Sequence, residues 1–130
     1  MTPIQKKVLQ ILQSFMQICD QLQLKYFLVC GSALGAVKYG GFVPWDDDVD
    51  VALFRNDYER FCKEAPALLP EQLFLQNFQS DPAFPAIYSK LRNSETTCIE
   101  ESIAALPINH GISIDIFPLD GYPKDKKEQE

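Results

Sequence analysis

Four of the five residues at positions 46–50 are aspartates, and this acidic cluster runs directly into an alternating apolar segment. Carboxylates packed this closely repel one another unless a cation or hydrogen-bond donors compensate them. From Asp48 onward the alternation predicts a strand. Val51 and Leu53 would then face the core, while Asp48 and Asp50 share the opposite face. The chain must therefore fold so that a buried strand carries paired carboxylates at its edge.

Paired carboxylates on one strand are typical of a site for a divalent cation. Asp48 and Asp50 offer hard oxygen ligands, which suit Mg²⁺ or Mn²⁺ with water and substrate phosphate in the remaining positions. A solvated acidic turn is the simpler alternative, but here the aspartates continue into apolar residues. An EF-hand calcium loop counted from Asp46 would need glycine where Val51 stands and glutamate where Asp57 stands.

A second alternating segment, Ile112 to Phe117, presents one carboxylate from an otherwise apolar strand. Burial of a lone Asp115 is costly unless the carboxylate is paired or bound to a metal. Placed beside the first strand, Asp115 would complete a site of three carboxylates. His110, the only histidine, precedes this strand. A general-base role for it is an alternative to the structural role that is usual for a loop histidine.

A glycine–serine turn follows an apolar run that we interpret as a buried strand, Tyr26 to Cys30. Gly31 permits close approach of the backbone, and Ser32 begins a short predicted helix that extends to Lys38. This arrangement suits a phosphate group. A turn that only caps the helix is the alternative.

The remaining elements are predicted from periodicity and turn signals. A first helix begins after Pro3 and carries an apolar stripe, and a second begins at Asn56 or Asp57. The first stripe comprises Ile4, Val8, Ile11, Leu12, Phe15, Ile18 and Leu22, and the second comprises Tyr58, Phe61, Cys62 and Ala65.

A strand and a hairpin are predicted in the region that follows. The strand covers Gln72 to Asn77, and the hairpin joins Ala86–Arg92 to Thr96–Glu100. Lys90 and Arg92 share one face of the hairpin's first strand. They could neutralise phosphate, or they could be solvated basic residues.

Length and charge narrow the class of protein. A chain of 130 residues is long enough for one domain with a real core. The net charge of −6 argues against binding to nucleic acid or to an anionic membrane surface, because both need a basic face.

The four cysteines lack the spacing of a zinc site and are expected to be free thiols. No transmembrane segment or secretory signal is recognised, so the expected location is the cytoplasm.

The motifs together resemble the LicD family, whose relatives include fukutin-related sugar-phosphate transferases within the nucleotidyltransferase-fold superfamily. The resemblance covers about Lys25 to Tyr122. It rests on the glycine–serine turn, on Gly-Gly-Phe-Val-Pro-Trp-Asp-Asp-Asp-Val-Asp and on Ile-Asp-Ile-Phe-Pro-Leu-Asp-Gly. It implies an α+β fold, a nucleotidyltransferase-like small mixed β-sheet flanked by helices.

The resemblance also implies a reaction and a set of residues for it. A substituted phosphate, such as phosphocholine, would pass from a CDP-linked donor such as CDP-choline to a hydroxyl of a glycan or teichoic-acid-type acceptor, releasing CMP. Asp48, Asp50 and Asp115 would bind Mg²⁺ or Mn²⁺. Ser32 would hold donor phosphate, and Asp46 would act as a base or support the metal ligands.

Two other functions remain open on the same residues. One is transfer of a nucleotidyl group from a nucleoside triphosphate, and the other is a non-catalytic module that binds nucleotide and metal. Family members usually continue beyond the Asp-Gly-Tyr-Pro segment. Residues 1–123 are therefore expected to form the nucleotidyltransferase-like domain, as the N-terminal part of a longer architecture. Residues 124–130 are expected to be a disordered charged tail.

Overall fold

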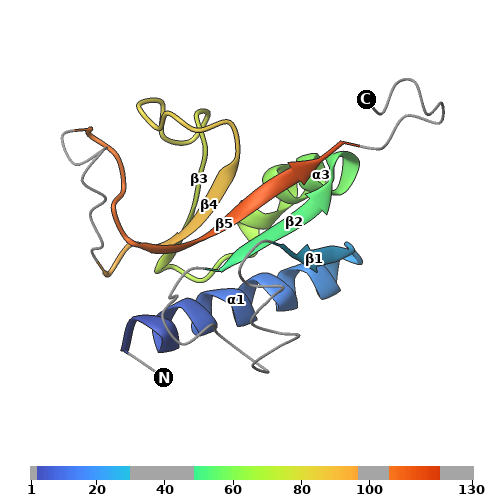
Figure 1. Cartoon of the computed structure of the whole chain (residues 1–130), viewed down its shortest axis with the longest axis horizontal. Helices are drawn as coiled ribbons and strands as arrows, with labels where there is room; N and C mark the ends of the chain where they lie inside the picture. The colour runs from blue at the N-terminus through green and yellow to red at the C-terminus, as the bar shows by residue number, and fades with distance from the viewer. Residues whose placement is uncertain (1–2, 30–48, 97–105, 121–130) are drawn as a thin grey trace.

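A computed structural model of the chain describes residues 3–29, 49–96 and 106–120. Within these ranges helices and strands both occur, and the strands form a single five-stranded sheet (Figure 1). The elements are α1 (Pro3–Leu22), β1 (Tyr26–Leu28), β2 (Asp50–Phe54), α3 (Arg55–Glu64), the 3-10 helix η1 (Ala65–Ala67), β3 (Leu73–Gln76), β4 (Ser89–Asn93) and β5 (Ile112–Leu119). The predicted α+β class, with a small mixed sheet flanked by helices, is confirmed.

The sheet has the strand order β1-β2-β5-β4-β3. The central pair, β2 and β5, is parallel, whereas every other pair is antiparallel. Figure 1 shows β2 and β5 running side by side although the intervening chain contains α3, β3 and β4. The two strands whose alternation was read from the sequence are therefore neighbours at the centre of the sheet.

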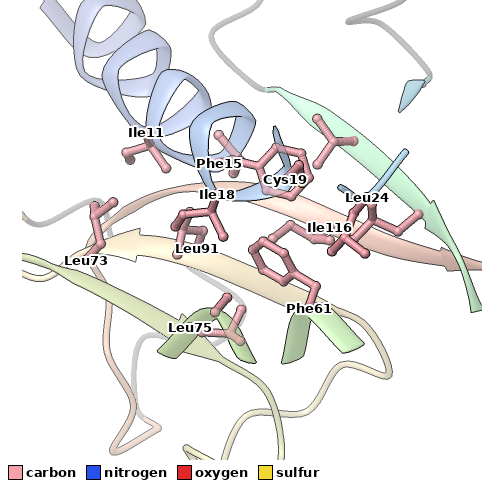
Figure 2. Packing of buried hydrophobic residues seen from close by; sticks show 14 of the residues in the cluster. Ile11, Phe15, Ile18, Cys19, Leu24, Phe61, Leu73, Leu75, Leu91 and Ile116 are labelled. Carbon is pink, nitrogen blue, oxygen red and sulfur yellow. The ribbon is translucent and has the colours of Figure 1, made fainter. Parts of the chain in front are cut away.

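Helix α1 forms because its apolar residues recur at helical spacing and bury one stripe against the sheet. Val8, Ile11, Phe15 and Ile18 are buried. Figure 2 shows the labelled α1 side chains facing Leu91 and Ile116 of the sheet. Ile4 was expected in the buried stripe but is 40% exposed, because it lies in the first turn of the helix.

Both helices pack on the same face of the sheet. Phe61 of α3 is fully buried, and its ring lies 5.2 Å from the ring of Phe15 of α1. The sheet contributes alternate residues of its strands to this core: Val51, Leu53, Leu73, Leu75, Leu91, Ile114 and Ile116. The residues between them, including Asp50 and Asp115, face the opposite side of the sheet, which we call the second face.

Strand β1 and helix α3 differ from the predicted elements, in burial and in starting residue respectively. The strand expected at Tyr26 to Cys30 as a buried element is β1, which lies at the edge of the sheet and is only partly buried. The second helix begins at Arg55, before the predicted capping residues Asn56 and Asp57. Strand β2 runs directly into α3, so Phe54 occupies the N-cap position and no side chain caps the helix.

The predicted hairpin between Ala86–Arg92 and Thr96–Glu100 does not form at β4, and residues 97–100 of its second strand lie outside the described residues. Strand β4 pairs with β3 on one edge and with β5 on the other, so neither edge is left for a hairpin partner. A turn does follow β4 at Ser94. The strand predicted at Gln72 to Asn77 is confirmed as β3, with Leu73 and Leu75 buried.

Gly111 shows why β5 can begin so close to the end of β4. A Cβ atom at this position would lie 2.1 Å from the carbonyl oxygen of Asn93. Backbone cannot yield to such a contact as a flexible side chain could, so only glycine permits this approach. Asn93 then pairs with Ile112, the first residue of β5.

Candidate metal and phosphate site

Asp50 and Asp115 lie side by side on the second face of the sheet. They are direct partners in the parallel register of β2 and β5. Each alternates with core residues of its own strand, which fixes the direction of its side chain. The backbone amide of Asp115 also donates a hydrogen bond of 3.0 Å to the carbonyl of Val49. The expectation that Asp115 lies beside the first acidic strand is thus confirmed for Asp50.

Lys90 of β4 lies in line with Asp50 and Asp115 on the second face, and we call these three side chains the charged row. It is the register partner of Asp115 across the antiparallel pair β4–β5. The Lys90 Nζ atom lies 3.1 Å from Oδ1 of Asp115, and the two side chains are only 8% and 24% exposed. An ion pair this sheltered is screened far less by water and salt than a surface pair. The lysine ammonium therefore compensates part of the negative charge of the two carboxylates.

Arg92 lies on the same face as Lys90, as predicted, but the residue is only 1% exposed. Its Nε donates a hydrogen bond of 2.6 Å to Oε1 of Gln76, and its Nη1 donates one of 2.6 Å to the carbonyl oxygen of Gly111. These bonds tie β4 to β3 and to the start of β5. Contact of Arg92 with phosphate stays a prediction.

Gln76 connects this arginine to two loops. Its Nε2 donates to Oδ2 of Asp81 and to the carbonyl oxygen of Asn109, both at 3.0 Å. The backbone N–H of Asn109 in turn donates a hydrogen bond of 2.9 Å to Oδ2 of Asp81. Several hydrogen bonds joined in one network hold its geometry more firmly than isolated bonds would. The network fixes the segment that leads into β5, and therefore the position of Asp115.

An aromatic wall borders the charged row and was not predicted from the sequence. The rings of Tyr88 and Phe117 lie 4.5 Å apart, and Phe84 contacts Tyr88 edge-on at 6.3 Å. Lys90 Nζ lies 6.0 Å from the centre of the Tyr88 ring. Phe117 is two positions after Asp115 on one strand, so the period-two spacing was the available signal. The pairing with Tyr88 depends on the register of β4 and β5.

Four predicted site residues lie outside the described residues: Gly31, Ser32, Asp46 and Asp48. The short helix predicted from Ser32 to Lys38 and the charged tail at 124–130 also lie outside them. Within the described ranges, no group of three or more histidine, cysteine, aspartate or glutamate side chains is placed to bind a metal. The described part of the site is therefore the pair Asp50 and Asp115 with Lys90.

The carboxylate oxygens of Asp50 and Asp115 suit a hard divalent cation. Two carboxylates from adjacent strands offer oxygen ligands, and Asp115 is partly accessible from solvent.

Neither described cysteine lies in the row of Asp50, Asp115 and Lys90. Cys19 is buried and Cys62 is partly buried, and both are free thiols. The expectation of free thiols is confirmed for these two.

His110 lies in the loop before β5. Its Nε2 is 3.1 Å from the carbonyl oxygen of Leu106, so the backbone of its own loop contacts the ring. This contact is of the kind expected for a structural loop histidine. A general-base role stays an untested alternative.

A cavity of about 590 Å³ lies between α3 and the chain that connects β3 to β4. Sequence reasoning missed it, because its walls come from segments distant in the chain. Ser89 contacts three of the lining residues: the Tyr58 hydroxyl at 2.7 Å, the Asn77 Nδ2 donor at 3.5 Å and the Cys62 Sγ at 3.6 Å. Burial raises the pKa of both Tyr58 and Cys62. Both groups are therefore neutral near pH 7.

Among the described residues, no helix is both long and apolar enough to cross a membrane.

Comparison with known proteins gives a consistent set of relatives. Residues 23–128 match the sequence model of a family described as LicD/FKTN/FKRP, nucleotidyltransferase domain. The lipopolysaccharide cholinephosphotransferase LicD of Haemophilus influenzae is 30% identical over 119 residues, which are 92% of this chain and 44% of that protein. An uncharacterized protein of Rickettsia prowazekii is 26% identical over 88% of this chain and 40% of its own length.

A mammalian protein matches a shorter part. The ribitol 5-phosphate transferase FKRP of Mus musculus is 38% identical over 40 residues, which are 31% of this chain and 8% of that protein. This chain therefore spans less than half the length of each of these three relatives.

Proposed function

Because this chain belongs to the LicD/FKTN/FKRP family of nucleotidyltransferase domains, we propose that it takes part in transfer of a substituted phosphate group. The donor is a CDP-linked molecule such as CDP-choline, and the acceptor is a hydroxyl of a glycan. The printed names of two relatives, a cholinephosphotransferase and a ribitol 5-phosphate transferase, support this class of reaction. The observation that carries the proposal is the pairing of Asp50 with Asp115 on one face of the sheet.

Asp50 and Asp115, together with Asp48, would hold Mg²⁺ or Mn²⁺. A divalent cation bound there would neutralise the diphosphate of the donor and so favour departure of CMP. The paired carboxylates support this assignment because adjacent like charges of this kind need a compensating cation.

The other residues bind and orient the reactants. Ser32 and the backbone at Gly31 hold donor phosphate, and Lys90 supplies a positive charge on the same face as the carboxylates. Arg92 carries a further positive charge on that face and holds β4 in place. The aromatic wall of Tyr88 and Phe117 offers a surface for the donor head group.

The transfer itself is a direct displacement at phosphorus. The oxygen of the acceptor hydroxyl forms a bond to the phosphorus that carries the head group, and the bond from that phosphorus to the oxygen of CMP breaks. CMP leaves with the electron pair, and Asp46 accepts the proton of the hydroxyl. The sheet contributes by fixing where the carboxylates and Lys90 lie before the donor arrives.

A labelling experiment tests the proposal against the two alternatives. The chain is incubated with Mn²⁺, a choline-free lipopolysaccharide and either CDP-choline labelled in the choline or the cytidine, or CTP labelled in the cytidine. We expect choline label on the acceptor and release of CMP, with loss of transfer in Asp50→Asn. Cytidine label on the acceptor would indicate nucleotidyl transfer. Metal-dependent binding of CDP-choline without transfer of either label would indicate a non-catalytic module.

A further inference from the structure

Asp50, Asp115 and Lys90 form a continuous charged row across β2, β5 and β4. The register pairs Asp50 with Asp115 and Asp115 with Lys90, so one carboxylate sits between a like charge and an opposite charge. The ion pair between Lys90 and Asp115 is short, at 3.1 Å, and the lysine side chain is 8% exposed. The Lys90 ammonium thus lies where a divalent cation would be expected to bind.

Asp115 cannot bind the Lys90 ammonium and a divalent cation at full strength at the same time. A divalent ion coordinated by Asp115 would bring two positive charges close to the Lys90 ammonium. In a sheltered site such repulsion is only weakly screened. We infer that Lys90 is a positioning residue that compensates part of the negative charge of the carboxylate pair in the metal-free protein and releases Asp115 when a divalent cation binds. This inference rests on the metal site of the proposed function.

The released ammonium has a defined second role. The lysine stem is flexible, and its charged end lies on the second face, 6.0 Å from the centre of the Tyr88 ring. Once Asp115 binds metal, the Lys90 ammonium can move toward an anion bound beside the carboxylates. Binding of a divalent cation should therefore strengthen the binding of a diphosphate through Lys90 as well as through the ion itself.

The first test measures Mn²⁺ binding to the metal-free full chain, by the loss of the electron paramagnetic resonance signal of free Mn²⁺. In Lys90→Met the competing cation is gone while the aliphatic stem remains. We expect the Kd for Mn²⁺ to fall by about tenfold, which corresponds to about 1.4 kcal/mol. Lys7→Met is the matched control, because this exposed residue of α1 makes the same change in net charge away from the carboxylates. It should leave the Kd within about twofold.

The outcomes separate the inference from the function on which it rests. If the parent protein binds no Mn²⁺, the metal site fails and the inference fails with it. If the parent binds Mn²⁺ and Lys90→Met binds it equally or more weakly, only the inference fails, because Lys90 would then act merely to shape the site. Should Lys90→Met not fold, Lys90→Gln replaces it, since glutamine removes the charge and can still donate a hydrogen bond to Asp115.

A second measurement tests the release of the lysine. Pyrophosphate is titrated into each protein by calorimetry, with and without saturating Mn²⁺. With Mn²⁺ we expect Lys90→Met to bind pyrophosphate about tenfold more weakly than the parent, and without Mn²⁺ we expect the two to differ by less than about threefold. An equal loss of pyrophosphate affinity with and without Mn²⁺ would contradict the release of Lys90 by the metal. Lys90 would then contact the anion whether or not Asp115 binds a metal.

Discussion

Replacement of Arg92 by methionine should destabilise the fold strongly. Arg92 is 1% exposed, and its guanidinium donates hydrogen bonds of 2.6 Å to Oε1 of Gln76 and to the carbonyl oxygen of Gly111. Gln76 is itself fully buried. Methionine fills much of the volume of the arginine stem but cannot donate to either oxygen, so two acceptors would lose their donors.

The size of the effect follows from these two bonds. A hydrogen bond to a charged group contributes about 1.5–3 kcal/mol, and a buried acceptor left without a donor retains its cost of desolvation. Arg92→Met should therefore lower the free energy of unfolding by about 3–5 kcal/mol. This is a large part of the roughly 5–15 kcal/mol that stabilises a typical domain.

Urea denaturation followed by circular dichroism measures the change. With an m-value of about 1.5 kcal/mol per molar, the midpoint should fall by about 2–3 M. Arg60→Met provides the matched control, because Arg60 is 48% exposed on α3, and its loss should cost no more than about 0.5 kcal/mol. A loss below about 1 kcal/mol for Arg92→Met, together with weakened pyrophosphate binding, would refute the structural role and favour direct contact with phosphate.

Three further perturbations test other parts of the fold and site. Gly111→Ala should destabilise the protein by about 2–3 kcal/mol in the same urea assay, because the new Cβ meets the carbonyl oxygen of Asn93; an unchanged midpoint would contradict this. Burial raises the pKa of the Cys19 thiol from 9.0 to about 12, so the folded state retains a proton that the unfolded state loses. Stability should therefore decline as pH rises above about 9, and Cys19→Ser should flatten this decline. Finally, Mn²⁺ at about 100 times its Kd should stabilise the protein by about 2.7 kcal/mol and raise the Tm by roughly 10 °C, whereas no shift would argue against a preformed site.

The part of the site that could be predicted from sequence is the part encoded by local alternation. The spacing of Asp50 relative to Val51 and Leu53, and of Asp115 relative to its flanking isoleucines, determines which way each carboxylate points once a strand forms. The register of β2 and β5 then brings them together. The amphipathic stripe of α1 was readable for the same local reason.

The rest depends on contacts between segments distant in the chain. The ion pair of Lys90 with Asp115 requires the register of β4 and β5, which no short-range pattern specifies. The hairpin prediction failed because a turn signal after Asn93 gives no information about the strands that occupy the edges of β4. Arg92 looked like a ligand for phosphate from its spacing, and its contacts with Gln76 and Gly111 emerge only from tertiary packing.

The proposed metal site requires that Asp50 and Asp115 bind a divalent cation together. Mn²⁺ is titrated by calorimetry into the parent chain, into Asp50→Asn and into Asp20→Asn, an exposed aspartate of α1 that serves as the control for charge. We predict saturable binding to the parent and to Asp20→Asn, and binding at least about tenfold weaker in Asp50→Asn. Equal affinity of all three proteins for Mn²⁺ would contradict the claim that this pair of carboxylates is a metal site.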